Sequence, residues 1–568
     1  LAENLRGAIH SLRESVKATF EPWRQTRDLK STLNKLKVDC PLLVAQFRNL
    51  SNTASRWMNA VDQIESVIKA KHPIYEAMGK LFVLLQQATR KMDGEEAEDA
   101  FERMMRSMEV IEQGVDDVVV LCQEEIKNVK APLTPLPSNT PTSQVPWFLV
   151  ADVDPDMIVL SAEGTVKGGT LHGLVQRLTQ HDQFGNSDAK FNVTFLLTYR
   201  SFCTTEEMFN ELFQRYQLSP PEELNAEEIA VWNEQKLKLI RLRVFNVIKS
   251  WLETYFNEEE DRPILATLSQ FTDQVIIQSM KFGAEQLSKL IKKRMLSEDS
   301  GQIRKMKLNV RTQDMPEPIL PKNLKRIKLL ELDPLELARQ MTMMDFKLYN
   351  RIKPVECLDK NWGKPEQEGH IAANVRASIE HSNQVTAWVT DSILSKEEAK
   401  KRATVLKFWI GVADRSRQLN NFNTCMAILS AFDNGSIGRL RRTWELISGR
   451  SMQILASIRR LMGSNRNFSE YREIIHRVNP PCIPFLGIYL QDLTFIEDGN
   501  SNFLKKSNRL ISFAKRMKTA SVIQELQQYQ SMHYMLTVVP DIQEFIKTHL
   551  QSSRDEEELY NLSLRLEP

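Results

Sequence analysis

The sequence is poor in cysteine, and the cysteines that it has do not form a site. Six occur in 568 residues, with no CxxC pair and no short Cys/His cluster. A structural zinc site needs several such ligands at close spacing, and a disulfide framework needs paired cysteines in a small secreted domain. The pattern argues against both and indicates a reducing compartment, so we expect a cytoplasmic protein with inert thiols.

Long apolar runs and an excess of one charge are also missing. No stretch approaches the roughly 20 apolar residues of a membrane-spanning helix, and the first residues show no signal-peptide pattern. Basic residues number 75 and acidic residues 73, which gives a formal net charge of +2. This balance does not point to nucleic acid or to a membrane surface, so partners must be inferred from local sites.

What the chain does contain is helix-forming sequence. At 568 residues, with 42% hydrophobic and 26% charged residues, it is expected to form several globular domains. Residues 1–130 show four amphipathic patterns joined by short polar turns, which predicts an antiparallel helical bundle. Since no catalytic constellation occurs there, we assign the bundle a scaffold or regulatory role with a regulatory partner of its own. Its longest apolar stripe consists of Phe101, Met104, Met108, Ile111, Val115, Val118, Cys122 and Ile126.

Two polar segments divide the remaining chain. Residues 131–151 contain several prolines among Ser and Thr and are predicted to form an exposed, semi-rigid linker. Residues 283–328 are charged and irregular and include the basic run Lys289–Arg294. We expect this second segment to be an exposed connector rather than a membrane-binding patch. These boundaries leave one domain at residues 152–282 and another at residues 329–568.

A small strand element opens the domain at residues 152–282. Met157–Leu160 reads as a short strand, and Gly164, Gly168 and Gly169 are expected to mark turns. No Lys-Ser/Thr pair follows these glycines, so they do not form a phosphate-binding loop. Helical patterns then fill the rest of the segment, which predicts a helical domain with a small strand element.

The stretch at residues 479–517 organises the C-terminal domain. Two prolines rule out a helix at its start and Pro484 suits a first helical turn, so a helix is predicted to begin near Phe485. It should end at Gly499, and a second helix should complete a protruding hairpin. The expected buried positions are Leu486, Tyr489, Leu490 and Leu493 on the first helix, and Leu504, Ile511, Ala514 and Met517 on the second. The basic residues Lys505, Lys506, Arg509 and Lys515 are expected to lie outside the second stripe.

The end of the first hairpin helix is electrostatically unusual. Glu497 and Asp498 are adjacent carboxylates on its last turn, where the helix dipole disfavours negative charge. Two interpretations stay open at this point, a solvated hairpin end or a site at which the carboxylates act on a partner. For an arbitrary hairpin the solvated end is the commoner explanation.

Ordered blocks of sequence carry a family resemblance. One block reads GTVKGGTLHGLVQRLT and continues with FLLTYRSFCTTEEMFNELFQRY. Four later blocks read LLELDPLELARQMTMMDFKLYNRIKPVECL, NQVTAWV with LNNFNTCMAILSAFDNGSIGRLRRTWELI, NPPCIPFLGIYLQDLTFIEDGN, and QELQQYQSMHYML. The first block resembles the N-terminal exchanger motif of Ras-type guanine nucleotide exchange factors. The later blocks resemble their Cdc25-homology catalytic domain, of the fungal Cdc25-like kind, and residues 1–150 lie outside the resemblance.

This resemblance implies a fold and an activity. The fold would be all-α: a helical bundle at residues 1–130, a helical exchanger-motif domain with a small strand element, and an all-helical catalytic domain with a protruding helical hairpin. The activity would need no covalent chemistry. The hairpin would insert at the switch I, Mg²⁺ and phosphate region of a Ras-family small GTPase and promote GDP release and GTP loading. No cofactor is expected in the chain, because Mg²⁺ and GDP or GTP belong to the GTPase.

The resemblance also assigns residues to two sites. At the hairpin tip, Thr494 would face the metal site and Asp498 would place a carboxylate where phosphate sits, while Glu497, Gly499 and Asn500 complete the tip. A second site would be an apolar pocket that takes an aromatic residue of the GTPase's second switch. Without the resemblance, its residues would be assigned to the core. They are Ile379, Met426, Phe468 and Phe485, with Trp362, Asn383 and Leu490 nearby.

Three positions depart from the family pattern. Thr494 is polar where relatives carry Leu or Ala, Glu380 stands where some carry Arg, and Asp433-Asn434-Gly435 replaces Asn-Ser-Ser. These departures concern Mg²⁺ exclusion and partner choice, so an exchanger for Rap or Ral rather than Ras stays open. So does a catalytically silent GTPase-binding scaffold, although the intact tip argues against it. Membrane contact is expected only through recruitment by lipidated Ras to the cytosolic face of a membrane.

Overall fold

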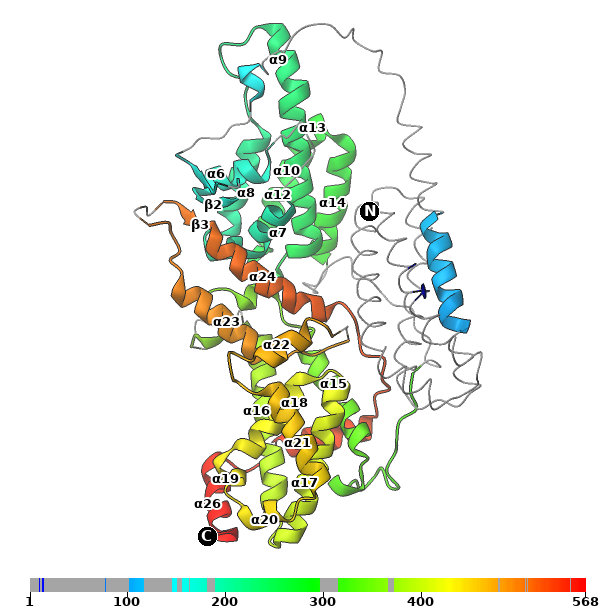
Figure 1. The fold of residues 1–568 in the computed structure, drawn as a ribbon. Helices are drawn as coiled ribbons and strands as arrows, with labels where there is room; N and C mark the ends of the chain where they lie inside the picture. Colours follow the sequence, from blue (N-terminus) through cyan, green and yellow to red (C-terminus); the bar gives the residue numbers. More distant parts are fainter. Residues whose placement is uncertain are drawn as a thin grey trace.

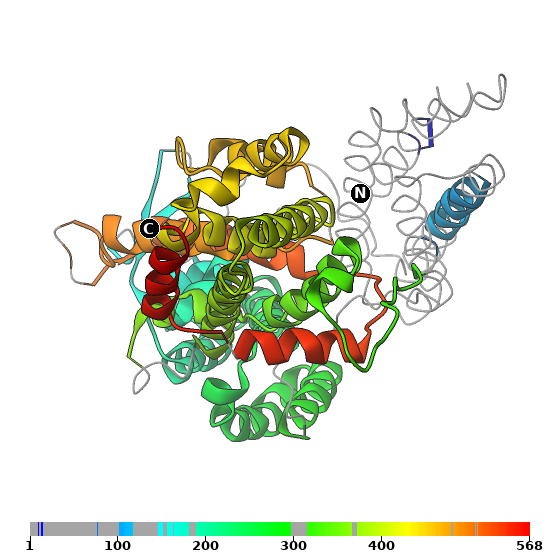
Figure 2. The ribbon, with the colours of Figure 1, turned by 90° about the horizontal axis from the view of Figure 1, so that it is seen from below.

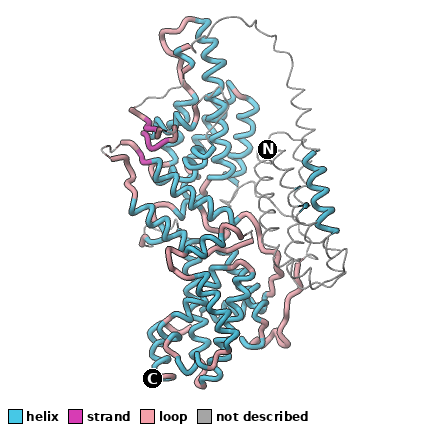
Figure 3. Tube along the Cα trace, in the orientation of Figure 1, coloured by secondary structure: helices cyan, strands magenta, loops and turns pink. Residues whose placement is uncertain are grey.

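The computed structural model describes residues 10, 13–14, 77, 102–116, 146–150, 156–162, 164–180, 189–296, 315–365, 372–478, 481–505, 507, 509–551 and 553–568. Across these residues the fold is built from helices, and three short strands form one sheet (Figure 1; Figure 3). The predicted all-α fold class is confirmed. Within the same residues, no helix combines the length and the apolar character that a bilayer crossing requires.

One helix of the predicted N-terminal bundle is described, at residues 102–116. Its spacing predicted the buried side correctly, since the apolar residues of the stripe that fall within it are fully buried. These residues are Met104, Met108, Ile111 and Val115. Most of the bundle, including Phe101, Val118, Cys122 and Ile126, lies outside the described residues, as do residues 131–145 of the predicted linker.

Residues 146–296 form a helical domain with two of the three strands. Its elements are η1 Trp147–Leu149, β1 Ile158–Leu160, β2 Val166–Gly169, α6 Leu171–Leu178, α7 Ala189–Thr198, η2 Tyr199–Ser201, α8 Thr205–Tyr216, α9 Ala226–Trp232, η3 Asn233–Leu237, α10 Lys238–Ser250, η4 Trp251–Tyr255, α11 Glu258–Asp261, α12 Ile264–Phe271, η5 Thr272–Ile276, α13 Ile277–Ser279 and α14 Lys281–Leu296. Local signals set helix starts here: α8 begins with a capping box between Thr204 and Glu207.

The TYRSF segment of this domain, Thr198–Phe202, contributes two residues to a buried polar cluster. Arg200 forms an ion pair with the fully buried Asp261 and also donates to the carbonyl of Tyr255 at 3.0 Å. The Tyr199 hydroxyl accepts from Nε1 of Trp251 at 3.0 Å. Because these contacts join η2, η4 and α11, the segment is a structural centre that ties the helices of the domain together.

Two of the glycines expected in turns lie in a strand instead. Gly168 and Gly169 belong to β2, which pairs antiparallel with β1 on one side and with β3 on the other. Only Gly164, with a φ of +78°, occupies a turn as predicted. The glycines were misleading because one partner of β2 is β3, which lies more than 300 positions away in the sequence. A β-carbon on Gly168 would lie 2.5 Å from the carbonyl oxygen of Ile511.

The start of the predicted connector at residues 283–328 is also wrong. α14 continues to Leu296 and buries Leu287 and Ile291 in the core of the N-terminal domain. Arg294, expected in an exposed basic run, is buried and donates from Nε to the carbonyl of Leu252 at 2.8 Å. Arg294 follows Leu287 and Ile291 at helical spacing, so it lies on the inner face of the helix. There the backbone carbonyl of Leu252 accepts a hydrogen bond from its guanidinium.

Residues 315–568 form the second helical domain. Its elements are η7 Leu329–Glu331, α15 Pro334–Tyr349, η8 Pro354–Cys357, η9 Asn361–Gly363, α16 Ala373–Leu394, α17 Ala399–Gln418, α18 Phe422–Asp433, α19 Gly435–Gly438, α20 Arg441–Glu445, α21 Gly449–Met462, α22 Ser469–Ile475, α23 Leu486–Gly499, β3 Ile511–Ser512, α24 Phe513–Gln530, α25 Pro540–Gln551 and α26 Glu556–Leu566. α15, α16, α17 and α18 pack together around one apolar core.

The hairpin differs from its prediction in the second half. α23 starts and stops where the prolines and Gly499 predict, and it buries Leu486, Tyr489, Leu490 and Leu493 as expected. α24 begins at Phe513 rather than near Leu504. The described residues between the two helices form a loop that ends in β3, and the pairing of β3 with β2 replaces the first turns of the expected helix.

The buried face of α24 also departs from expectation. Lys515, predicted outside, is buried at 2% exposure, and the adjacent Arg516 is buried as well. Ala514 and Met517 are only partly buried, whereas Ile511 is buried as expected. Lys505 and Arg509 are exposed as predicted, and Lys506 lies outside the described residues. Tertiary partners for the buried cations, described below, account for the difference.

The two domains share a sheet and a core. β3, from the hairpin, extends the sheet of the N-terminal domain by pairing with β2 in the order β1-β2-β3. Phe513 enters the N-terminal domain's core, where its ring stacks on Phe191 with 4.5 Å between centroids. In Figure 1, α24 runs along the boundary between the domains, and it packs against α7. The hairpin is therefore braced from both sides.

The C-terminal helix closes the opposite end of the second domain. α26, red in Figure 2, packs against α16 and α19. Glu567, just beyond it, is buried and accepts from Nη2 of Arg402 at 2.8 Å and from the hydroxyl of Thr443 at 2.6 Å. Arg402 is itself fully buried, so this ion pair anchors the end of the chain to α17 and α20.

Candidate functional site

The first turn of α23 is built to hold Phe485 in place. The backbone N–H of Phe485 donates to the hydroxyl of Tyr471 at 2.8 Å, which satisfies one of the free donors at the helix start. Gly487 leaves room for the ring, because a β-carbon there would lie 2.6 Å from Cζ of Phe485. Further along the helix, Arg472 binds both carboxylate oxygens of Asp492, at 2.7 and 2.8 Å. This bidentate pair fixes α23 against α22.

The last turn of α23 is closed by a side-chain cap. Nδ2 of Asn500 donates to the carbonyl of Ile496 at 2.8 Å, and its Oδ1 accepts from Lys518 at 2.9 Å. Thr494 is satisfied within the helix, since its hydroxyl donates to the carbonyl of Leu490 at 2.8 Å. The polar residues of the tip thus have partners within the protein, and the helix end is well defined.

The acidic tip has a structural counter-charge that the sequence did not reveal. Nζ of the buried Lys515 binds Oε1 of Glu497 and also donates to the Glu497 carbonyl at 3.2 Å. A cation at the last carbonyls of a helix offsets the negative end of the dipole as well as the carboxylate. The unfavourable placement of Glu497 is therefore compensated from α24.

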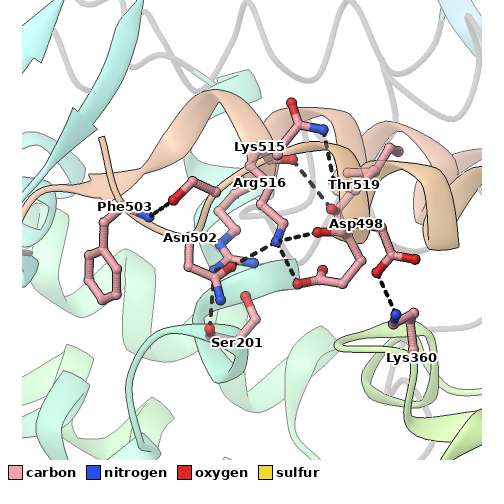
Figure 4. A network of polar contacts seen from close by, with 12 residues as sticks. Ser201, Lys360, Asp498, Asn502, Phe503, Lys515, Arg516 and Thr519 are labelled. Carbon is pink, nitrogen blue, oxygen red and sulfur yellow. Dashed lines mark hydrogen bonds and ion pairs between the residues drawn. The ribbon is translucent and has the colours of Figure 1, made fainter. Parts of the chain in front are cut away.

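The second tip carboxylate is held from a different part of the chain. Asp498 is paired with Lys360, which directly precedes η9 in the turn at residues 358–364 (Figure 4). Unlike Glu497 and Lys515, both of these side chains are substantially exposed, at 58% and 39%. Asp498 is thus the tip carboxylate that solvent or a partner can reach.

A set of partly buried contacts ties the tip to the N-terminal domain. Oδ1 of Asn502 accepts from Lys515 at 2.8 Å and from Arg516 at 3.0 Å. Arg516 also donates to the carbonyl of Ser201 at 3.2 Å, and Figure 4 shows these two residues side by side. Its guanidinium lies over the ring of Phe202, 5.8 Å from the ring centroid. Burial lowers the pKa of the Arg516 guanidinium, although nearby carboxylates act in the opposite direction. The TYRSF segment therefore supports the hairpin directly.

Asp359, next to Lys360, belongs to the same charged group. Burial raises the pKa of its carboxyl, and the neighbouring Glu497 raises it further, while Arg516, Lys364 and Lys515 lower it. The turn therefore brings one acid and one base to the underside of the tip. Acidic and basic side chains are neighbours in this group, and their mutual attraction favours one fixed arrangement of the side chains.

Five of the residues predicted to line an apolar pocket are partly exposed, and two of them, Phe468 and Phe485, are neighbours. Phe468 and Phe485 are partly buried, with 6.3 Å between ring centroids, and Trp362 and Met426 pack on the same core. Ile379 is 36% exposed on α16. These five are apolar side chains that remain accessible, which is the character expected of a partner-binding surface.

The two other predicted contact residues differ from these five. Leu490 is buried in the core, so it supports α23 rather than presenting a surface. Asn383 is exposed on α16 and is available for a polar contact. Phe468 follows Arg466 and Asn467, and all three have φ values between +49° and +57°. Left-handed backbone at non-glycine residues is unfavourable and concentrates at functional sites, which supports a role for this corner.

Sequence reasoning missed the residues that hold the tip. Lys360 lies 138 positions from Asp498, and Ser201 lies 315 positions from Arg516, so no local pattern could pair them. The buried Lys515 carried one signal: it is a cation in the same hairpin, 18 positions from an unexplained carboxylate. A search for a counter-charge to Glu497 could have found it.

The described residues offer no evident covalent chemistry around the hairpin. Cys482 beside it is fully buried. Burial raises the pKa of the Cys425 thiol to about 12, so that thiol stays protonated at neutral pH. In the described part of the chain, no group of three His, Cys, Asp or Glu side chains is placed to hold a metal ion.

Comparison with known proteins identifies both domains. The RasGEF domain family matches residues 336–517, and the RasGEF N-terminal motif family matches residues 165–272. Cell division control protein 25 of Saccharomyces cerevisiae is 35% identical over 446 residues, which cover 75% of this chain and 28% of that protein. Its namesake in Candida albicans is 34% identical over 435 residues, 75% of this chain and 32% of that protein.

A shorter relative supports the same assignment. Ras guanine nucleotide exchange factor A of Dictyostelium discoideum is 35% identical over 421 residues, which cover 71% of this chain and 65% of that protein. The chain thus spans about a third of the length of the two fungal relatives. With an N-terminal exchanger motif, a RasGEF domain and these relatives, the chain belongs to the family of Ras-type guanine nucleotide exchange factors.

Proposed function

We propose that this chain is a guanine nucleotide exchange factor that promotes GDP release and GTP loading on a Ras-family small GTPase. α23 would insert its tip at the switch I, Mg²⁺ and phosphate region of the GTPase. The observation that carries the proposal is the layout of α23, which has the accessible Phe485 at its start and the exposed Asp498 at its end. These residues are 13 positions apart, so they lie about 20 Å from each other along the helix.

The mechanism would use binding energy rather than covalent chemistry. A Ras-like GTPase holds its nucleotide through a phosphate loop, a lysine and Mg²⁺. A picomolar grip corresponds to about 16 kcal/mol, and an ordinary association rate then implies release over days. An exchanger accelerates release by binding the nucleotide-free GTPase better than the loaded one, and the coupling is reciprocal. The interface must therefore oppose the nucleotide.

Each part of α23 would have a share in this opposition. Asp498 would offer a carboxylate to the lysine and serine that phosphate leaves behind, and the same charge would repel phosphate. Thr494, Glu497, Gly499 and Asn500 would shape the tip around it. Phe485 and its apolar neighbours would anchor the second switch. The sheet contact of β3 and the buried pair of Glu497 with Lys515 keep the tip in a fixed position, which limits the entropy lost on binding.

The GTPase would supply the cofactors, and it would also supply the membrane contact. Mg²⁺ and GDP or GTP would stay with the GTPase, so we assign the chain no cofactor of its own. We expect the protein in the cytoplasm, with recruitment to the cytosolic face of membranes through a lipidated GTPase. We also assign the N-terminal bundle a regulatory partner, for which residues 102–116 supply one amphipathic helix.

Release of a fluorescent GDP analogue tests the proposal. Purified Ras, Rap and Ral, each loaded with the analogue, are mixed with catalytic amounts of the chain and excess GTP. We expect acceleration on Ras. Acceleration on Rap or Ral alone would reassign the partner, and complex formation without acceleration would favour a silent GTPase-binding scaffold. No acceleration on any of the three would contradict an exchange function.

Charge reversal at the tip separates insertion from simple binding. Asp498→Lys should slow exchange by at least about 10-fold, because a lysine would meet the lysine of the emptied phosphate site. Binding to the nucleotide-free GTPase should fall less than the rate does, since the apolar anchor around Phe485 remains. An unchanged exchange rate would show that Asp498 does not enter the phosphate site.

A further inference from the structure

An exposed ion pair joins the hairpin tip to the turn at residues 358–364. Nζ of Lys360 lies 2.5 Å from Oδ1 of Asp498, and solvent reaches both side chains, which are 39% and 58% exposed. Figure 4 shows Lys360 extending from the turn toward Asp498 at the end of α23. The two residues belong to separate sequence blocks, so the fold itself brings this base to the tip.

The backbone of the turn aims Lys360 at the tip. Asp359 and Lys360 have φ values of +50° and +53°, in a region that non-glycine residues rarely occupy. The carbonyls of Asn361 and Trp362 each accept from Arg376 on α16 at 3.2 Å, which fixes the turn to the domain. Lys360 is therefore presented from a rigid support, and strained positions of this kind concentrate at functional sites.

The two carboxylates of the tip are held in contrasting ways. Lys515 is buried, so removing the Glu497 carboxylate would leave its charge with only neutral acceptors, among them Oδ1 of Asn502. Lys360 and Asp498 are exposed, so water can replace either partner at little cost. One pair is therefore permanent, and the other can open without disturbing the fold.

We propose that Lys360 is a releasable latch that holds Asp498 in the free protein and must let go when the hairpin engages the GTPase. The inference rests on the proposed function, in which Asp498 meets the cation of the emptied phosphate site. Lys360 and that cation compete for the same carboxylate. The latch therefore subtracts from the affinity for the nucleotide-free GTPase and slows exchange, so Lys360 is a positioning residue that restrains the tip.

Ionic strength offers a way to recognise the latch. Salt screens interactions between exposed charges over about 10 Å at 0.1 M, so the pair of Lys360 with Asp498 weakens as salt is added. Once the tip is enclosed by a GTPase, its contacts are shielded from salt. Removing Lys360 should therefore matter most at low ionic strength.

The test compares exchange rates of Lys360→Asn with those of the unsubstituted chain. Asparagine removes the charge and tolerates a left-handed backbone, so the turn is kept. At a GTPase concentration well below saturation and at low salt, we expect exchange about two- to fivefold faster, with the gain lost at high salt. Lys407→Asn is the matched control and should leave the rate unchanged, because Lys407 is exposed on α17, outside both the hairpin and the turn at residues 358–364.

A double-mutant cycle assigns the effect to the tip. In an Asp498→Asn background, Lys360→Asn should give no gain, because no carboxylate is left to release. Lys360→Arg, which keeps the charge, should not reproduce the gain. A gain that persists without Asp498, or one that Lys360→Arg also produces, would overturn the latch.

The remaining outcomes separate the latch from the proposed function. Acceleration by the unsubstituted chain with an equal or slower rate for Lys360→Asn, at an unchanged melting temperature, would overturn the latch alone. No acceleration by the unsubstituted chain would overturn the exchange function and the latch together.

Discussion

Among single residues, Phe485 combines accessibility with a tightly specified position. Its amide is held by Tyr471, its ring lies near that of Phe468, and Gly487 gives the ring its space. A residue placed so firmly yet left partly exposed is a strong candidate for an interface anchor. The family resemblance pointed to the same residue, whereas its apolar character alone suggested only core.

We expect Phe485→Ala to reduce exchange by at least about 30-fold, because truncation of an anchoring aromatic typically removes 2 kcal/mol or more of binding. The loss should appear in the affinity for nucleotide-free GTPase, measured by titration. Unfolding in urea should show a smaller effect, since the ring is only partly buried. Phe282→Ala, at a 73% exposed residue of α14, is the control and should leave exchange unchanged. An active Phe485→Ala would remove the apolar anchor from the proposal.

At the level of elements, the two halves of the hairpin show what the sequence can predict. α23 follows from local signals, since prolines precede it, apolar residues recur at helical spacing and Gly499 ends it. α24 does not, because Leu504 and Ile511 fit a helical spacing while β3 is set by pairing with β2, over 300 positions away. Tertiary pairing overrode the local pattern there.

The candidate site divides in the same way. The tip residues on α23 were found through a motif that local sequence carries. Lys360, Lys515 and Arg516 were not, because their partners lie in other elements and only the folded chain brings the charges together. Lys515 was placed outside its helix on the reasonable expectation that lysine is exposed.

The joint between β2 and β3 gives a prediction at this scale. A methyl group on Gly168 would lie 2.5 Å from the Ile511 carbonyl oxygen and 2.8 Å from Cδ1 of Leu504, so Gly168→Ala should force the strands apart. We expect exchange to fall by roughly 10- to 100-fold, because a small misplacement of a positioned group has effects of that order.

Hydrogen exchange measured by mass spectrometry should locate the cause. The peptide that contains Ile511 and Ser512 should lose protection in Gly168→Ala, while peptides of α17 should not. Lys167→Ala, at an exposed position of the same strand, is the control for both measurements. Full activity with lost protection would mean that the sheet does not position the tip.

For the molecule as a whole, the buried pair of Glu567 with Arg402 links stability to pH. Burial would raise the pKa of Glu567, but hydrogen bonds from Thr443, Arg402 and the Arg442 amide outweigh it and keep the pKa below its ordinary value. A carboxyl with a lowered pKa stabilises the fold above its unfolded pKa of about 4.3. That contribution is lost as the pH falls through the folded-state value.

Glu567→Gln should lower the free energy of unfolding by about 3 kcal/mol at pH 7, because Arg402 would keep its burial and lose its counter-charge. The difference from the unsubstituted chain should narrow at an acidic pH below the lowered folded-state pKa, where Glu567 becomes protonated. Urea unfolding at both pH values measures it, with the exposed Glu557→Gln as control. A pH-independent difference would mean that the charge of Glu567 is not what stabilises this end.

The shared sheet also limits how the molecule can be divided. Ile511 and Phe513 belong to the second domain by sequence but lie in the core of the first. Cutting the chain between α14 and η7 would expose these two side chains to solvent. It would also leave β2 and β3 with unpaired edges, which promote self-association. The two domains should therefore be expressed together. Recombination or truncation at the sequence boundary would yield pieces prone to aggregate rather than two working modules.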